Sequence, residues 1–334
     1  MRVGLYLDLR NPPRWRRPWA DLYAKTLDRI GIAEDLGIGS VWLTEHHFFE
    51  DGYLPQPMTF AAAIAARTRR VRIGSAVMLA TLRPAVDIAE QSAIVDILSD
   101  GRLELGLGAG YVAEEFLAFG SDIHDRYPML ERRAREVREL WGRGAVTPSP
   151  VQDRLPIWIG GRGPRAARIA GRLGEGLLCL LPSVFEVYLD ALRAAGHDPD
   201  CARVAGLANL ILADDPEAAW AQIRPHLAYQ WESYARHGAQ GSVSVRSAAV
   251  AEAKDLAKVD LLRSPGPVMT PPHFDVTTVA DAVDRLRGWL GGLPVTDVFF
   301  WDSIAGMPDE LVERHIELLA SRLVPAVARL SDAR

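Results

Sequence analysis

Short apolar segments alternate with longer amphipathic segments along the whole chain, and this alternation restricts the possible folds more than any other feature of the sequence. The short segments are rich in β-branched and aromatic residues, which is typical of buried strands. The longer segments carry apolar residues three or four positions apart, which predicts helices. We predict strands over residues 3–9, 40–44, 71–79, 102–107, 157–159, 176–181, 204–212 and 295–301. We predict helices over residues 20–36, 58–68, 84–98, 129–141, 165–173, 184–195, 216–234, 278–290 and 309–328.

Eight strands that alternate with helices are what a parallel sheet needs in order to close on itself. We therefore predict a (β/α)8 barrel, or TIM barrel, in which residues 1–334 form a single domain. An open, doubly wound sheet is the competing architecture, but its G-x-G-x-x-G fingerprint does not follow the first strand. The chain has a Pro-, Trp- and Arg-rich loop there, over residues 11–19. Residues 238–272 have weak periodicity and several prolines, so we expect an insertion or lid.

The composition restricts the possible partners. Of the 334 residues, 49% are hydrophobic and 24% are charged, and the net charge is −5. This balance predicts no basic surface for nucleic acid, and no apolar run approaches the roughly 20 residues that cross a membrane. The N-terminal segment predicts a strand and not a signal peptide. Cys179 and Cys201 form neither a metal-ligand spacing nor a disulfide framework. We therefore expect a soluble, cytoplasmic protein that binds neither nucleic acid nor membrane.

An acid and two histidines follow the second predicted strand. The apolar run that begins at Val41 ends at Glu45, His46 and His47. In a barrel, the C-terminal ends of the strands converge on one face, and that face carries the functional site. An imidazole exchanges protons near neutral pH, so these residues are candidates for acid–base chemistry. A hydrogen-bonded loop tip without a chemical role is the alternative interpretation.

Two other predicted strands end in glycine-rich turns that precede helices. One turn covers residues 108–111 and the other covers residues 160–164, which include Arg162. Glycines leave backbone N–H groups uncovered, and a helix N-terminus attracts anions, so such turns can bind phosphate. Tight turns also need glycine for steric reasons. Two such turns on one face, one of them with an arginine, favour a phosphorylated ligand.

The sequence shows no clear set of metal ligands. His46 and His47 are adjacent, so their side chains diverge if the backbone is extended. No third ligand has a recognisable spacing, and we therefore expect no metal site. The G-x-S-x-G motif of a serine nucleophile is also absent. The residues thus predict a pocket for a phosphate-bearing ligand with an imidazole beside it.

The sequence resembles the bacterial luciferase-like flavin-dependent monooxygenase family over most of its length. The similarity is carried by residues 41–48, 72–77, 89–91, 99–111, 115–116, 119–120 and 156–161. Members of this family are (β/α)8 barrels that bind reduced FMN or a deazaflavin, commonly as dimers. The resemblance therefore implies the same barrel, the same kind of cofactor and a homodimer.

The resemblance also implies roles for individual residues. His46 would be the catalytic histidine beside the flavin, with Glu45 in the same catalytic cluster. Ala76 and Val77 match the place where family members often have a non-prolyl cis peptide under the flavin ring. The residues that we expect around the cofactor are His47, Ala76, Val77, Met78, Gly108, Ala109, Gly110, Tyr111, Gly160, Gly161, Arg162 and Gly163.

The sequence departs from the family pattern in two places. Bacterial luciferase has an arginine for the flavin phosphate where this chain has Ala109, and we hypothesise that Arg162 supplies the charge from the neighbouring turn. Residues 79–84 form a shorter segment than usual and lack the histidine that often precedes the proline. Both departures imply that cofactor binding is weaker or differently arranged.

Taken together, these features predict a two-component monooxygenase. It would take reduced FMN from a separate flavin reductase and use O2 to oxygenate a small organic substrate, with residues 11–19 and 238–272 covering the site. One alternative is a hydride-transfer oxidoreductase that uses the deazaflavin F420 and needs no O2. Another is a non-catalytic flavin-binding protein, which Ala109 favours and the intact residues 45–47 disfavour. A phosphate-binding hydrolase or aldolase is disfavoured because no predicted strand ends in a lysine.

Overall fold

Among the residues that the structure describes, nine strands form one parallel sheet that closes on itself. The structure is a computed structural model and describes residues 1–238, 256, 259–260, 263 and 274–332. The strands are β1 (Arg2–Leu7), β2 (Ser40–Leu43), β3 (Arg72–Ser75), β4 (Met78–Leu79), β5 (Leu103–Gly108), β6 (Ile157–Gly160), β7 (Gly176–Leu178), β8 (Val204–Ala208) and β11 (Val295–Trp301). Their order is β3-β2-β1-β11-β8-β7-β6-β5-β4, and β3 also pairs with β5, which completes the ring. Both β3 and β4 pair with β5, so they are two parts of one interrupted barrel strand; each position in the ring is here called a stave. The ring therefore has eight staves, and the predicted barrel is confirmed.

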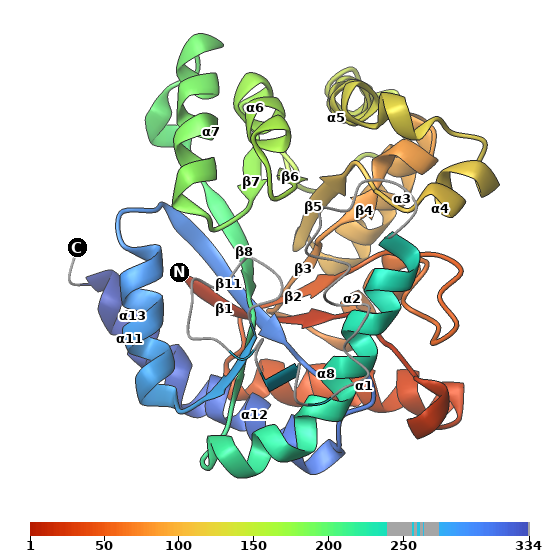
Figure 1. Cartoon of the computed structure of the whole chain (residues 1–334). Helices are drawn as coiled ribbons and strands as arrows, with labels where there is room; N and C mark the ends of the chain where they lie inside the picture. Colours follow the sequence, from red (N-terminus) through yellow and green to blue (C-terminus); the bar gives the residue numbers. More distant parts are fainter. Residues whose placement is uncertain (239–255, 257–258, 261–262, 264–273, 333–334) are drawn as a thin grey trace.

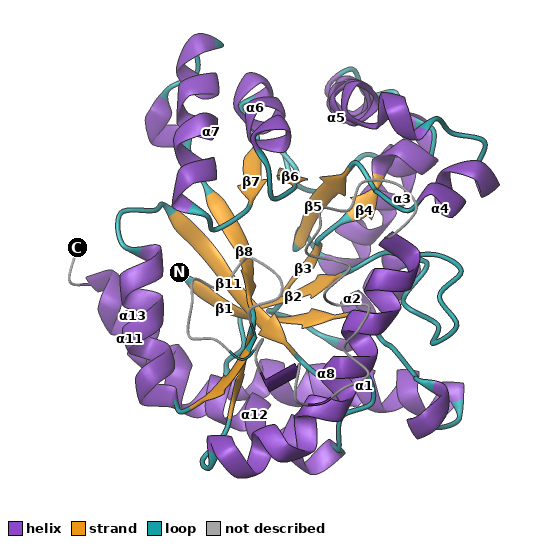
Figure 2. Cartoon of the chain, in the orientation of Figure 1, coloured by secondary structure: helices purple, strands orange, loops and turns teal. Residues whose placement is uncertain are grey.

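Helices surround the ring of strands (Figures 1 and 2). They are α1 (Trp19–Leu36), α2 (Pro57–Arg67), α3 (Ala85–Ser99), α4 (Ala113–Ala118), α5 (Arg126–Gly142), α6 (Pro164–Leu173), α7 (Pro182–Ala194), α8 (Pro216–Gly238), α11 (Val279–Leu290), α12 (Asp309–Leu318) and α13 (Val324–Asp332). The predicted helices are present close to their predicted bounds. The sequence did not predict α4, because six residues are too few to show a helical period.

The third stave is interrupted, although the sequence predicts one strand over residues 71–79. A cis peptide between Ala76 and Val77 separates β3 from β4, at the position that the family resemblance implied. Just before this interruption, the Ser75 hydroxyl donates a hydrogen bond to the Gly106 carbonyl at 2.8 Å and accepts one from the Gly106 N–H at 2.9 Å. These two hydrogen bonds continue the connection between the third stave and β5 where the regular ladder stops.

The predicted strand over residues 204–212 is also divided. Its second part, β9 (Leu210–Leu212), pairs with β10 (Asp275–Thr277) in a separate two-stranded sheet, and β10 was not predicted. The division falls at Asn209, whose side-chain oxygen accepts a hydrogen bond from the indole of Trp301 at 3.1 Å. This contact, which joins residues far apart in the sequence, marks the point where the chain leaves the ring.

The predicted lid over residues 238–272 falls almost entirely outside the described residues. Within it, the structure describes only Gly238, Leu256, Val259, Asp260 and Arg263. The lid therefore stays a prediction, as does the organisation of residues 1–334 as a single domain.

Inside the barrel, large aromatic side chains lie against glycines of neighbouring strands. Trp42 and Trp158 are buried and meet edge to face, with ring centroids 6.0 Å apart. A side chain at Gly74 would overlap the Trp42 ring, and one at Gly176 would overlap the Trp158 ring. Glycine is unfavourable in strands. Its presence here follows from the space that the two tryptophans occupy.

Gly108→Ala should destabilise the fold. A Cβ at Gly108 would overlap the side chain of Val77, which also lies against Gly160. Overpacking of this kind costs about 1–3 kcal/mol in the free energy of unfolding, which urea denaturation measures. Gly31→Ala in α1 is the matched control, because a Cβ there would meet no atom within 4 Å, and it should be neutral or slightly stabilising.

Adding Val77→Ala to Gly108→Ala should recover most of the lost stability, because the overlapping methyl groups are removed. If Gly108→Ala unfolds at the same urea concentration as the wild type, the space between position 108 and Val77 is not too small for a methyl group, and the prediction is wrong.

Candidate active site

The carboxyl ends of the parallel strands lie on one face of the barrel, here named the C-terminal face. Arg10 follows β1, His46 follows β2, Tyr111 follows β5 and Arg162 follows β6. These residues are far apart in the sequence, and closure of the ring brings the loops that carry them to the same face (Figure 1). The predicted location of the site therefore agrees with the topology.

His46 lies at the centre of a buried cluster, with 6% of its surface exposed. Its Nδ1 atom lies 2.9 Å from Oε1 of Glu115, a residue of α4. Its Nε2 atom lies 3.1 Å from the hydroxyl of Tyr111. The aromatic rings around the imidazole are those of Phe49, which stacks on it, and of Tyr53, Tyr111 and Tyr234, which meet it edge to face. The imidazole thus has a partner on each nitrogen within an aromatic surround.

Glu45 has a different set of partners. Its fully buried carboxylate accepts a hydrogen bond from the Leu79 N–H at 2.8 Å, lies 2.8 Å from Nε2 of His47 and forms a 2.6 Å ion pair with Arg83. These contacts tie the end of β2 to β4 and to the residues that follow the 3₁₀ turn η2 (Ala80–Leu82). The two adjacent histidines therefore diverge, as their spacing predicted, because His46 contacts α4 and His47 contacts Glu45.

A buried arginine lies beside the aromatic cluster. Arg10 forms ion pairs with Asp8 at 3.1 Å and with Asp51 at 2.6 Å, and its guanidinium lies over the rings of Tyr53 and Tyr234. Burial raises the pKa of Asp8 to about 7, although the charge of Arg10 acts in the opposite direction, and neighbouring carboxylates raise this pKa further. This part of the site therefore holds a carboxyl group, that of Asp8, which exchanges a proton near neutral pH.

Arg162 and the turn around it have the features of an anion site. Gly163 is the N-cap of α6, and a Cβ there would meet no atom within 4 Å. Arg162 is exposed, and its side chain has no hydrogen bond or ion pair in the described part of the chain. Burial raises the pKa of Tyr6 and Tyr111, and the positive charge of Arg162 opposes both shifts, so the guanidinium lies near the C-terminal face. An unpaired guanidinium beside a bare helix N-terminus can hold a phosphate.

The remaining predicted cofactor residues form the wall beside these groups. The Ala76 carbonyl accepts a hydrogen bond from the Tyr6 hydroxyl at 3.0 Å, and the Ala109 carbonyl accepts one from Thr81 at 3.0 Å. Met78 is buried in β4. The backbone of Gly110 has a positive φ of 69°, as a glycine turn allows. These residues border the C-terminal face, whereas His47 is turned toward Glu45.

The sequence analysis assigned no role to five members of the site. Glu115 lies in the short helix α4, and its place in a segment that carries the family resemblance was the available signal. Arg83 lies in the loop after η2 and belongs to no segment that carries the resemblance. Arg10 directly follows the first strand and Asp8, and this position at a strand end was the available signal. Tyr53 and Tyr234 are recognisable only from their contacts with His46 and Arg10.

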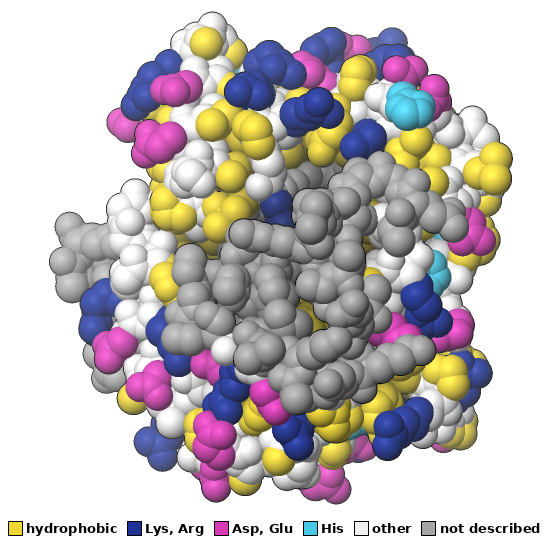
Figure 3. All heavy atoms as spheres, in the orientation of Figure 1, with side chains coloured by type: hydrophobic (Ala, Val, Ile, Leu, Met, Phe, Trp, Pro, Cys, Tyr) yellow, Lys and Arg dark blue, Asp and Glu magenta, His cyan; other side chains and the backbone are white. Residues whose placement is uncertain are grey.

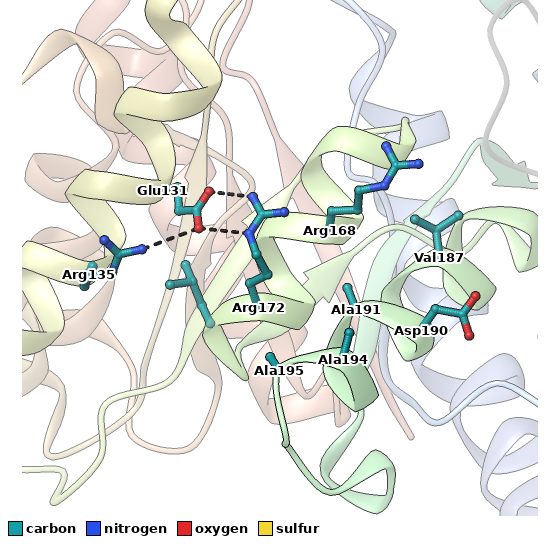
Figure 4. A pocket seen from close by; sticks show the side chains of 10 residues that line it. Glu131, Arg135, Arg168, Arg172, Val187, Asp190, Ala191, Ala194 and Ala195 are labelled. Atoms are coloured by element: carbon teal, nitrogen blue, oxygen red, sulfur yellow. Dashed lines mark hydrogen bonds and ion pairs between the residues drawn. The ribbon is translucent and has the colours of Figure 1, made fainter.

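A separate cavity of about 660 Å³ lies on the outer surface, between α5, α6 and α7 (Figure 4). In Figure 4, Arg172 and Arg135 point toward Glu131, while Arg168 extends away from it. The cavity is lined by residues of the helices and by none from the loops of the C-terminal face. It is therefore distinct from the site around His46.

Among the described residues, no group of three or more His, Cys, Asp or Glu side chains is placed to hold a metal ion. In the same part of the chain, no helix has the length and apolar character needed to span a bilayer. On the described surface that Figure 3 shows, basic and acidic side chains are interspersed. That view therefore shows no broad patch of positive charge and none of negative charge.

Comparisons with known proteins agree with this architecture. The protein belongs to the luciferase-like monooxygenase family, whose model matches residues 1–284. The resemblance inferred from the sequence is thereby confirmed.

The relatives of this chain differ in the activities that their names state. An F420-dependent glucose-6-phosphate dehydrogenase from Amycolatopsis mediterranei is 34% identical over 184 residues, which are 49% of this chain and 55% of that relative. One from Rhodococcus erythropolis is 29% identical over 248 residues, which are 65% of this chain and 73% of that relative. The structure of monooxygenase RslO1 from Streptomyces bottropensis matches with a TM-score of 0.75 and 26% identity, over 98% of this chain and 100% of that one. This chain thus matches about half the length of the first relative and the whole length of the last.

Asp8→Asn should change how stability depends on pH. Because burial raises the pKa of Asp8 from 3.8 to about 7, the folded protein keeps a proton between these values that the unfolded chain has lost. The contribution of Asp8 to stability is therefore fully present below about pH 4 and is lost as the pH rises to about 7. Asparagine does not titrate, so the variant should gain stability relative to the wild type by up to about 1.4 kcal/mol per pH unit across this range.

Urea unfolding at several pH values between 4 and 7 measures this difference. Asp35→Asn is the control, because the Asp35 side chain is 81% exposed and its removal should leave the pH profile parallel to that of the wild type. A parallel profile for Asp8→Asn would mean that Asp8 is ionised throughout.

Proposed function

We propose that the protein is a deazaflavin-dependent oxidoreductase that transfers hydride between F420 and a small organic substrate. The observation that carries this proposal is the similarity to dehydrogenases named F420-dependent, at 34% and 29% identity. Both values exceed the 26% identity to the monooxygenase with the same fold. Sequence patterns alone favoured an FMN-dependent monooxygenase, and the identities support the deazaflavin enzyme better.

The described residues fit a phosphate-bearing cofactor. Arg162 lacks a counter-ion among the described side chains and adjoins the open N-terminus of α6, so Arg162 and Gly163 would hold a phosphate. This arginine would supply the charge that the family pattern places at Ala109. Val77 and the glycines beside it would form the apolar wall of the site. The bound deazaflavin would supply the atom that accepts or releases hydride.

The cluster around His46 would handle the proton that accompanies hydride transfer. Oxidation of an alcohol removes a hydride from carbon and a proton from oxygen, and an imidazole is suited to accept that proton near neutral pH. The aromatic rings around His46 exclude water from this step. Glu45, held by three partners, would keep the loop that carries His46 in place.

A two-component FMN monooxygenase is the second candidate. It is favoured by the match to RslO1, which extends over essentially the whole of both chains. In that case, a separate flavin reductase would supply reduced FMN, and the protein would use it with O2 to oxygenate a small organic substrate. The same site residues would serve, so the two candidates differ in the cofactor and in the need for O2.

Titration with F420 and, separately, with anaerobic reduced FMN distinguishes the candidates. We expect tight binding of F420 and its reduction by small alcohols without O2. Preference for reduced FMN, with O2 consumption in the presence of a reductase, would replace the first proposal by the second. Binding of either cofactor without turnover would indicate a non-catalytic flavin-binding protein.

Arg162→Ala should weaken cofactor binding by about 10–100-fold, which corresponds to the loss of a charge-assisted hydrogen bond. Arg168→Ala is the matched control. Arg168 lies in α6, six residues after Arg162, but its side chain lines the outer cavity. Equal dissociation constants for Arg162→Ala and the wild type would show that another group binds the phosphate.

We also propose that two copies of this chain associate through α3. This helix exposes Val86, Ile94, Ile97 and Leu98, and their spacing puts them on one outward side. An exposed apolar helix face of this kind is typical of an interface between identical chains.

Ile94→Glu should therefore convert a dimer into monomers in sedimentation experiments, whereas Leu117→Glu, on the exposed side of α4, should not. A monomeric wild type would contradict the proposal.

A further inference from the structure

Both nitrogen atoms of the His46 imidazole are occupied, so neither is free to contact a ligand. Nδ1 lies against Glu115 and Nε2 lies against the Tyr111 hydroxyl, and Phe49 covers one face of the ring. Only 6% of His46 is exposed, whereas Tyr111 is partly exposed at the C-terminal face. A tyrosine oxygen can donate one hydrogen bond and also accept others. The Tyr111 hydroxyl can therefore contact His46 and a substrate at the same time.

Glu115 is placed to select which nitrogen of His46 carries the hydrogen. Its Oε1 atom accepts the His47 backbone N–H at 2.8 Å and lies 2.9 Å from Nδ1 of His46. As a carboxylate, Glu115 would only accept hydrogen bonds, which would put the hydrogen on Nδ1. The lone pair of the neutral imidazole would then be on Nε2, which lies 3.1 Å from the Tyr111 hydroxyl, and this hydroxyl would donate to it. The hydrogen bonds would therefore run in one direction, from Tyr111 through His46 to Glu115.

We propose that the Tyr111 hydroxyl is the group that exchanges a proton with the substrate, with His46 as the proton acceptor behind it and Glu115 as a positioning residue. This inference rests on the proposed function, in which an alcohol loses hydride to a deazaflavin. The substrate O–H bond breaks and its proton goes to Oη of Tyr111, while the proton of Tyr111 goes to Nε2 of His46. The electron pair of the O–H bond becomes the carbonyl π bond as hydride leaves the carbon. In the reverse direction, His46 returns a proton to Tyr111 while Tyr111 gives its proton to the substrate oxygen.

The surroundings suit a transient positive charge on His46. The Glu115 side chain is fully buried, and its Oε2 atom has no hydrogen-bond partner in the described part of the chain, so its hydrogen bonds to the described residues are made by Oε1. Burial raises the pKa of Tyr111 well above its ordinary value, so this residue gives up its proton only as it gains another. Among the described residues, the titratable and charged groups that face His46 are Glu115, Tyr111, Tyr53 and Tyr234, with Arg10, Asp8 and Asp51 behind the two tyrosines.

NMR of the cofactor-free protein with 15N-labelled histidine tests the direction of the hydrogen bonds. We expect His46 to have hydrogen on Nδ1 and a lone pair on Nε2. Tyr111→Phe should move the Nε2 resonance by removing its donor, whereas Tyr53→Phe, which removes a hydroxyl that bonds to Tyr234, should not. Glu115→Gln should give mixed tautomers, because an amide can donate as well as accept. Hydrogen on Nε2 in the wild type would overturn the proposal.

Kinetics of the holoenzyme test the role of Tyr111. Tyr111→Phe should lower kcat by about 10²–10⁴-fold, with KM and the cofactor dissociation constant changed by less than about threefold. Tyr127→Phe, on α5, is the control and should behave as the wild type. Melting temperatures show whether each variant is folded. A Tyr111→Phe variant with wild-type turnover would remove Tyr111 from proton transfer.

These two tests also separate this inference from the proposed function. If the wild type oxidises no alcohol with a deazaflavin, the proposed function fails and with it the assigned reaction of Tyr111. The NMR result then still decides whether Glu115, His46 and Tyr111 form the directed chain of hydrogen bonds.

Discussion

The closure of the ring between the third stave and β5 is the constraint on which the site depends. Ser75 and Gly106 exchange two hydrogen bonds there, and a side chain at Gly106 would overlap the Ser75 carbonyl. The third stave lies between β2 and β5, so this closure sets the distance between them. His46 follows β2 and Tyr111 follows β5. Their contact therefore requires a closed ring and would not form in an open sheet with the same strands.

Two buried carboxylates then hold the loops of the C-terminal face in place. Glu45 accepts from the backbone of Leu79 and pairs with Arg83, and Glu115 accepts from the backbone of His47. A buried carboxylate is costly unless donors surround it, so each of these acids requires its partners to stay in position. As a result, the imidazole is held in one orientation by contacts that also fix the backbone on both sides of it. In the proposed reaction, this fixed orientation would preorganise the site for proton transfer.

The fold was predictable from the sequence to the extent that its signals are local. Strands such as residues 295–301 and helices such as residues 85–99 each carry their own periodicity, and the count of eight strands indicated a closed ring. The departures occur where a distant residue determines the local structure. β8 ends just before Asn209, whose side chain accepts a hydrogen bond from Trp301, and no pattern around residue 209 reveals that contact. The helix α4 was missed because six residues cannot display a period.

The candidate site shows the same division. The sequence by itself determined the barrel, the face on which the site lies and the residues at the strand ends, including His46, Tyr111 and Arg162, because side-chain period and strand order set these positions. Only the tertiary structure decided the partners of His46, since Tyr111 and Glu115 are 65 and 69 residues away from it in the sequence. Hydrogen bonds at such separations depend on how the ring closes and on which way each side chain turns. A one-dimensional pattern contains neither of these quantities.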